Sequence, residues 1–83
     1  MRTVGAHGHR DSEAIAQFQE AVRLAPNSIQ ARNNLAVVLA RAGRIPEAIE
    51  QLKAAQQIDP TNAEISRNLA KLQATQDGAP TNP

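Results

Sequence analysis

Apolar residues recur at spacings of three and four from Ser12 to Gln76, which is the period of amphipathic helices rather than of strands. Four such series follow one another along the chain: Ala14, Ile15, Phe18, Ala21, Val22 and Leu24; Ile29, Ala31, Leu35, Ala36, Val38 and Leu39; Ala48, Ile49, Leu52, Ala55 and Ile58; and Ile65, Leu69 and Leu72. No two-residue alternation is long enough for a strand. The pattern therefore predicts an all-α domain of four helices, each of about 13–16 residues.

Turn residues separate these helical segments. They cluster at Ala25–Ser28, Ala42–Pro46 and Asp59–Asn62. Pro26 and Pro60 cannot continue a helix, so the preceding helices should end near Ala25 and Asp59. Ser28 can accept an unpaired N–H group of the next helix, and Asn62 can do the same further on. Gly43 suits a left-handed residue after a helix. Loops this short place successive helices antiparallel.

The chain also matches itself when it is shifted by 34 residues. Glu13–Ile15 falls on Glu47–Ile49, and Asn34–Ala36 falls on Asn68–Ala70. In total, ten of the 29 positions from Ser12 to Ala40 are identical after the shift. A fixed period of this length indicates repeated units that stack on one another.

This helix-turn-helix period resembles the tetratricopeptide repeat family. Its pattern of large and small residues is met by Leu35, Ala36, Leu39, Ala48, Leu52 and Pro60. The resemblance covers about residues 12–74 and implies a short α-solenoid of four antiparallel helices, residues 12–76. One full repeat, 28–62, is preceded by a half repeat and followed by a C-terminal capping helix. We expect residues 1–11 to form a flexible segment and residues 77–83 a disordered tail.

The resemblance implies a protein-interaction module that binds an extended peptide in a concave groove. Its groove residues would lie on the second and fourth helices: Gln30, Asn33, Asn34, Val37, Arg41, Glu64, Arg67, Asn68 and Lys71. Asn34 and Asn68 are 34 residues apart, so they should share one face, where their carboxamides could hold a peptide backbone. A local structural role for these two asparagines is the alternative interpretation.

Some members of the family grip the terminal carboxylate of a chaperone tail with lysine, arginine and asparagine. Asn34 matches that clamp, but Glu64 and Asn68 stand where a lysine and an arginine are expected. We therefore do not expect chaperone-tail binding. Arg67 and Lys71 could still attract an acidic peptide, although exposed cations of this spacing are usually a solvated face.

A half repeat at the start leaves part of the first helix without its usual neighbour. We hypothesise that two chains associate into a homodimer through Ile15, Phe18 and Val22, so that the chain would be a structural self-assembling unit without a separate ligand. The alternatives are that the chain is a fragment of a longer array, or that the N-terminal segment folds back over this face.

Composition narrows the function further. The 83 residues include no Cys and one aromatic residue, Phe18, and carry a net charge of +1. This excludes thiolate chemistry and argues against a nucleic-acid partner. The longest apolar run, Leu35–Ala40, is far too short to span a membrane, and Met1–His9 lacks the apolar core of a signal peptide, so we expect a cytoplasmic protein.

Candidate chemistry is sparse. His7 and His9 could hold a metal only loosely, because no third ligand follows in a structured site. No catalytic triad or phosphate-binding loop is present, and Glu13, Glu20, Glu47 and Glu50 suit the polar faces of helices. We predict no enzyme activity, no catalytic residue, no metal site and no cofactor.

Overall fold

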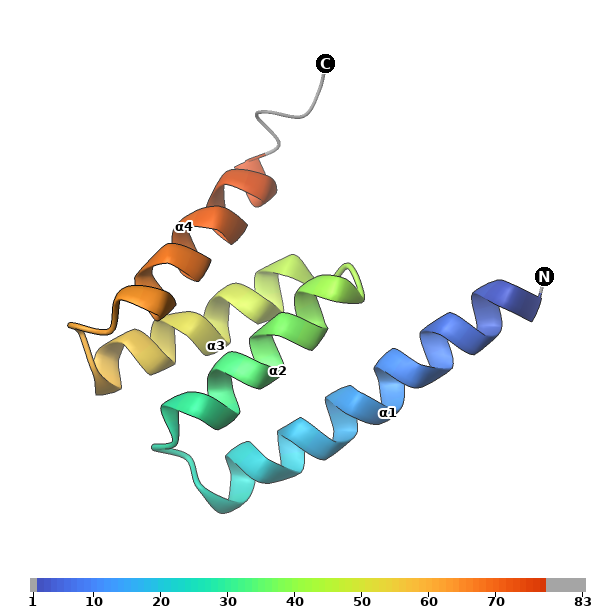
Figure 1. Ribbon diagram of the computed structural model, residues 1–83, viewed down its shortest axis with the longest axis horizontal. Helices are drawn as coiled ribbons and strands as arrows, with labels where there is room; N and C mark the ends of the chain where they lie inside the picture. Colours follow the sequence, from blue (N-terminus) through green and yellow to red (C-terminus); the bar gives the residue numbers. More distant parts are fainter. Residues whose placement is uncertain (1, 78–83) are drawn as a thin grey trace.

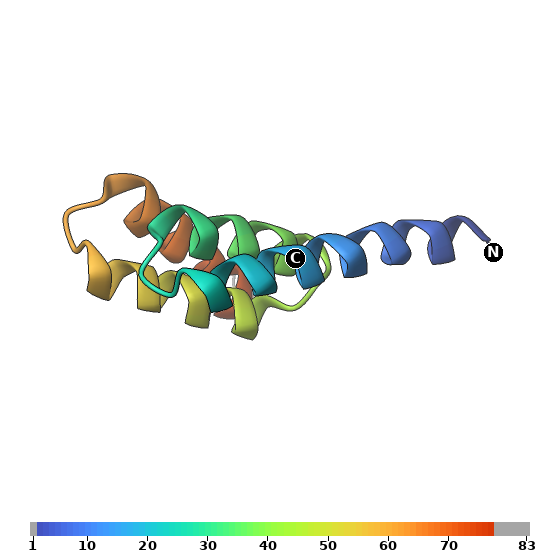
Figure 2. The same ribbon diagram turned by 90° about the horizontal axis from the view of Figure 1, so that it is seen from below.

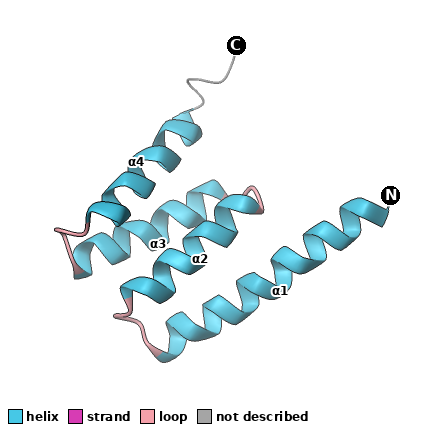
Figure 3. Cartoon of the chain, in the orientation of Figure 1, coloured by secondary structure: helices cyan, strands magenta, loops and turns pink. Residues whose placement is uncertain are grey.

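The computed structural model describes the backbone of residues 2–77 and the side chains of residues 10–76, and this part of the chain is entirely helical apart from its turns (Figures 1 and 3). The four helices are α1 (Arg2–Leu24), α2 (Ile29–Arg41), α3 (Ile45–Ile58) and α4 (Ala63–Asp77). The all-α prediction is thus confirmed for the described residues.

Successive helices pack against each other, α1 on α2, α2 on α3 and α3 on α4. The result is a thin body of 43 × 37 × 15 Å, which Figure 2 shows edge-on. Each helix meets mainly its neighbours in sequence, as expected of a repeat architecture.

The predicted helix caps form. The Ser28 hydroxyl accepts the backbone N–H of Ala31 at 3.1 Å, at the start of α2. The Asn62 side chain accepts the N–H of Ile65 at 3.0 Å, at the start of α4. Both caps satisfy donors that a helix leaves unpaired in its first turn.

The turn between α2 and α3 depends on Gly43, which has φ +85°. We expect Gly43→Ala to lower the free energy of unfolding by about 1 kcal/mol, because a side chain disfavours the left-handed conformation. A Cβ at this position would meet nothing within 4 Å, so the cost should come from the backbone alone. Urea denaturation would measure it; a loss well above this value would mean that the added methyl group clashes in the folded state.

The core follows the predicted apolar spacing. Its buried residues come from all four helices: Ile15, Leu35, Ala36, Val38, Leu39, Ala48, Ile49, Leu52, Ala55, Ile65 and Leu69. Small residues among them, such as Ala36, Ala48 and Ala55, allow the helix backbones to approach closely.

The prediction for the start of the first helix is wrong. α1 begins at Arg2 instead of near Ser12, so residues 2–11 are helical where an irregular segment was expected. The physical reason is that glycine inside a helix costs only about 1 kcal/mol, whereas proline, which would stop it, is absent before Pro26. Asp11 also ties this part of α1 to α2 through an ion pair with Arg41, at 3.8 Å.

Two other expectations concern residues or side chains that the structure does not describe. The expected disordered tail falls largely on residues 78–83, which the structure does not describe. The backbone of His7 and His9 belongs to α1, but their side chains also lie outside the described part.

Candidate functional site

A hydrogen-bonded bridge joins the two predicted groove helices. The Asn68 amide on α4 donates to the Asn33 carbonyl oxygen on α2 at 3.1 Å. The Asn33 amide in turn donates to the Glu64 carboxylate in a long contact of 3.5 Å. These bonds connect α2 and α4, which both pack against α3.

Two hollows flank this bridge. The first, of about 170 Å³, is lined by Asn33, Ala36, Val37, Ala40, Leu52, Asn68, Lys71 and Leu72. The second, of about 350 Å³, is lined by Ile29, Gln30, Asn33, Asn34, Asn62, Glu64 and Ile65. The first hollow is mostly apolar and ends on a cation, whereas the second is mostly polar and contains an anion. The two ends of the groove therefore differ in polarity and in charge.

Seven of the nine predicted groove residues line these hollows. The exceptions are two arginines. Arg41 forms the ion pair with Asp11 of α1 and lines neither hollow. Arg67 is exposed on α4 and lines neither hollow.

Asn34 and Asn68 were expected to share one face that binds a peptide backbone, and this stays a prediction; the side chain that Asn68 bonds to is Asn33. Asn34 lines the polar hollow and Asn68 the apolar one, whereas Asn33 lines both. The 34-residue spacing gives equivalent positions on the two helices, but packed helices meet through different positions. The helix crossing therefore decides which side chains touch.

The structure separates the three residues predicted for self-association. Ile15 is buried in the core of its own chain, with 6% of its surface exposed, so it cannot contribute to a surface. Phe18 and Val22 are half-buried against that core. The opposite side of α1 is polar, with exposed residues such as Glu13 and Glu20.

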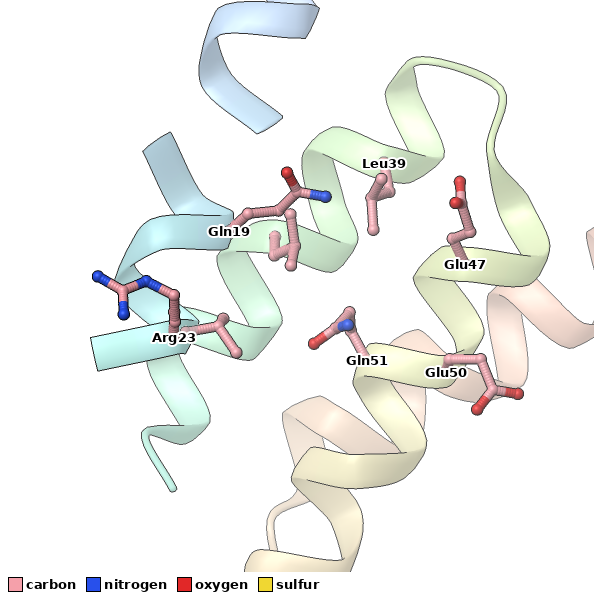
Figure 4. Close-up of a pocket in the computed structure, with 8 residues that line it drawn as sticks. Gln19, Arg23, Leu39, Glu47, Glu50 and Gln51 are labelled. Carbon is pink, nitrogen blue, oxygen red and sulfur yellow. The ribbon is translucent and has the colours of Figure 1, made fainter. Parts of the chain in front are cut away.

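A third hollow, of about 370 Å³, lies between α1 and α3 (Figure 4). It is lined by Gln19, Val22, Arg23, Leu35, Leu39, Glu47, Glu50 and Gln51. In Figure 4, Gln19 and Gln51 point into the space between the helices, whereas Arg23 and Glu50 point away from it. This hollow was not predicted from the sequence, because glutamates at helical spacing indicate only the polar faces of helices. The only signal was that α1 and α3 are equivalent helices, which a solenoid places side by side.

The charges around the third hollow are largely paired. Arg23 contacts Glu20 at 2.5 Å, and Arg44 contacts Glu47 at the same distance. The Arg23 guanidinium lowers the pKa of the Glu20 carboxyl below its usual value, and the carboxylate raises the pKa of Arg23. Both members of each pair are exposed to solvent, so these pairs contribute little to stability.

A tetratricopeptide repeat family model matches residues 10–63, which include α2, α3 and the part of α1 that packs on α2. The chain belongs to the tetratricopeptide repeat family. Repeats of this family generally mediate protein–protein interactions and are typically non-catalytic. Among curated proteins, no sequence matches the chain. The match covers the full repeat predicted from the sequence and thus confirms the resemblance.

The described residues contain neither a membrane-spanning helix nor a metal-binding cluster. None of the helices there has the length and apolar character needed to cross a membrane. In the same part of the chain, no three His, Cys, Asp or Glu residues are grouped so that they could hold a metal ion.

Proposed function

We propose that the chain is a non-catalytic binding module of the cytoplasm that holds an extended peptide along the α2–α4 groove. The observation that carries this proposal is the amide bridge between Asn33 and Asn68, with an open hollow on each side. Carboxamides can donate and accept at once, so they can bond to a peptide backbone whatever its side chains are. No bound metal or cofactor is required.

The linings of the two hollows favour one class of peptide. Val37 is 47% exposed and lines the apolar hollow together with Leu72, where an apolar side chain could be buried. Lys71 lines the same hollow and can pair with a carboxylate. At the other end, Glu64 disfavours an acidic group. We therefore propose a peptide in which an apolar residue and an acidic one lie close together in sequence.

A charge reversal would test this assignment. Peptides selected from a display library with a fixed apolar–acidic pair should bind the wild type, and Lys71→Glu should weaken that binding about tenfold. The matched control is Lys53→Glu, which makes the same change on the exposed face of α3 and should leave affinity unchanged. Chemical shift changes on peptide addition should centre on Asn33 and Asn68.

The opposite results would contradict the proposal. If no peptide of this class binds, or if shift changes centre on the hollow between α1 and α3, the α2–α4 groove is not the binding site. Equal losses of affinity for the two lysine variants would show that the interaction depends only on overall charge.

Self-association is the second candidate function, and one observation favours it. Phe18 remains half-buried although the matching residue of α3, Leu52, is completely covered. An apolar side chain of this size gains free energy when its remaining surface is buried. The homodimer predicted from the sequence is one form that such association could take.

A further inference from the structure

The repeat gives an internal template for the uncovered part of α1. The face of α3 that packs on α2 consists of three residues with almost no exposed surface: Ala48 (0%), Leu52 (1%) and Ala55 (0%). The matching residues 34 positions earlier are only half-buried: Ala14, Phe18 and Ala21. Gln51, on the same side of α3, accepts a hydrogen bond of 2.9 Å from Arg32 of α2. Its counterpart on α1, Gln17, is exposed.

At the other end of the body, α4 shows the complementary gap. On α2, Arg32 and Ala36 lie one turn apart on the face that covers α3, and Ala36 is 1% exposed. The residue of α4 that matches Ala36 is Ala70, which is exposed, and Ala74 one turn later is exposed as well. Within the described residues, α4 thus presents the covering face of a repeat with no helix beneath it.

We propose that α4 of one copy packs on α1 of the next copy, so that two half repeats from different chains complete one repeat. Ala70 and Ala74 would lie over Ala14, Phe18 and Ala21, in the geometry that α2 adopts over α3. This inference rests on self-association, the second candidate function, and does not depend on peptide binding in the groove.

The residues that change between the two interfaces are compatible with this packing. Phe18 is larger than Leu52 and can fill space beside small alanines. Gln73 stands at the position of the buried Leu39 and adds a polar side chain to this face of α4. These substitutions keep the interface closely packed but make it more polar, which suits reversible association.

Electrostatics also favour a second copy as the occupant. Arg10 matches Arg44, whose backbone N–H bonds to Leu39 in the last turn of α2. In the proposed contact, Arg10 would therefore lie near the C-terminal end of α4, where the helix dipole attracts a cation. A net charge of +1 also gives little repulsion between copies.

Head-to-tail association through α4 and α1 can be distinguished from a symmetric dimer by the size of the assembly. An α4–α1 contact uses two different surfaces, so each added copy leaves one of each free and growth continues. A symmetric α1–α1 contact would stop at two chains and would leave the exposed alanines of α4 uncovered.

Sedimentation velocity over a range from micromolar to millimolar concentration tests the proposal. The wild type should show an average mass that rises with concentration well beyond two chains of 8.9 kDa. Ala70→Arg and Ala14→Arg should each remain at the mass of one chain, because each places a charge in one half of the contact. Ala16→Arg, an exposed change on another side of α1, is the matched control and should behave as the wild type.

Mixing the two blocked variants gives the sharpest result. Ala70→Arg keeps a free α1 face and Ala14→Arg keeps a free α4 face, so an equimolar mixture should form dimers and grow no further. If circular dichroism shows that Ala14→Arg does not fold, Gln17→Arg replaces it, because Gln17 is exposed in the single chain.

Each other outcome overturns the proposal in a recognisable way. A dimer that survives Ala70→Arg but not Ala14→Arg would indicate a symmetric α1 contact, so self-association would stand and the head-to-tail contact would fail. A single-chain mass for the wild type at every concentration would reject both the head-to-tail contact and the symmetric α1 contact.

Discussion

Leu52→Ala should lower the free energy of unfolding by about 3 kcal/mol, since removing a fully buried leucine side chain costs 2–5 kcal/mol. Leu52 is 1% exposed and lies in α3 where the core meets the apolar hollow beside α2 and α4. Because small domains have only about 0.1 kcal/mol of stability per residue, this one change should remove a large share of the total.

Phe18→Ala is the matched control, because Phe18 holds the same repeat position in α1. Phenylalanine loses more atoms than leucine, yet we expect a smaller loss, about 1–2 kcal/mol, because Phe18 is only partly buried in the single chain. Urea denaturation at low micromolar concentration keeps self-association out of the comparison. A loss for Phe18→Ala as large as that for Leu52→Ala would show that the face of α1 is covered in the single chain.

Most of the fold could be predicted from the sequence because its signals are local. The turns carry proline, glycine and capping side chains, and the structure confirms Ser28, Gly43 and Asn62 in these roles. The start of α1 has no such signal. The glycines before Ser12 weaken a helix without ending it, and composition alone could not show where the helix begins.

The groove was predictable as a face but not as a set of contacts. Helical periodicity puts Asn33, Asn34 and Asn68 on the polar side of their helices, and all three line the hollows. Which of them bond depends on how α2 and α4 cross, and a spacing of 34 residues carries no information on that angle. The hollow between α1 and α3 depends on a similar juxtaposition of helices distant in sequence.

Ala48→Leu should be the second most damaging of the proposed changes. Ala48 is 0% exposed in α3, on the face that packs against α2, so three added carbon atoms have no space unless the helices separate. Overpacking of this kind costs about 1–3 kcal/mol, and here it would disturb the one complete repeat. The expected result is a lower midpoint of thermal unfolding with the helical content at low temperature preserved.

The same substitution one repeat earlier should have a different outcome. Ala14→Leu places the larger side chain on the half-exposed face of α1, where it can extend beside Phe18 without displacing a helix. We expect dilute Ala14→Leu to be as stable as the wild type within about 0.5 kcal/mol, since leucine is also a good helix former. If both alanine variants were destabilised equally in dilute solution, a helix would already cover Ala14 as α2 covers Ala48. Comparing the two variants therefore shows whether a neighbouring helix covers Ala14 as closely as α2 covers Ala48.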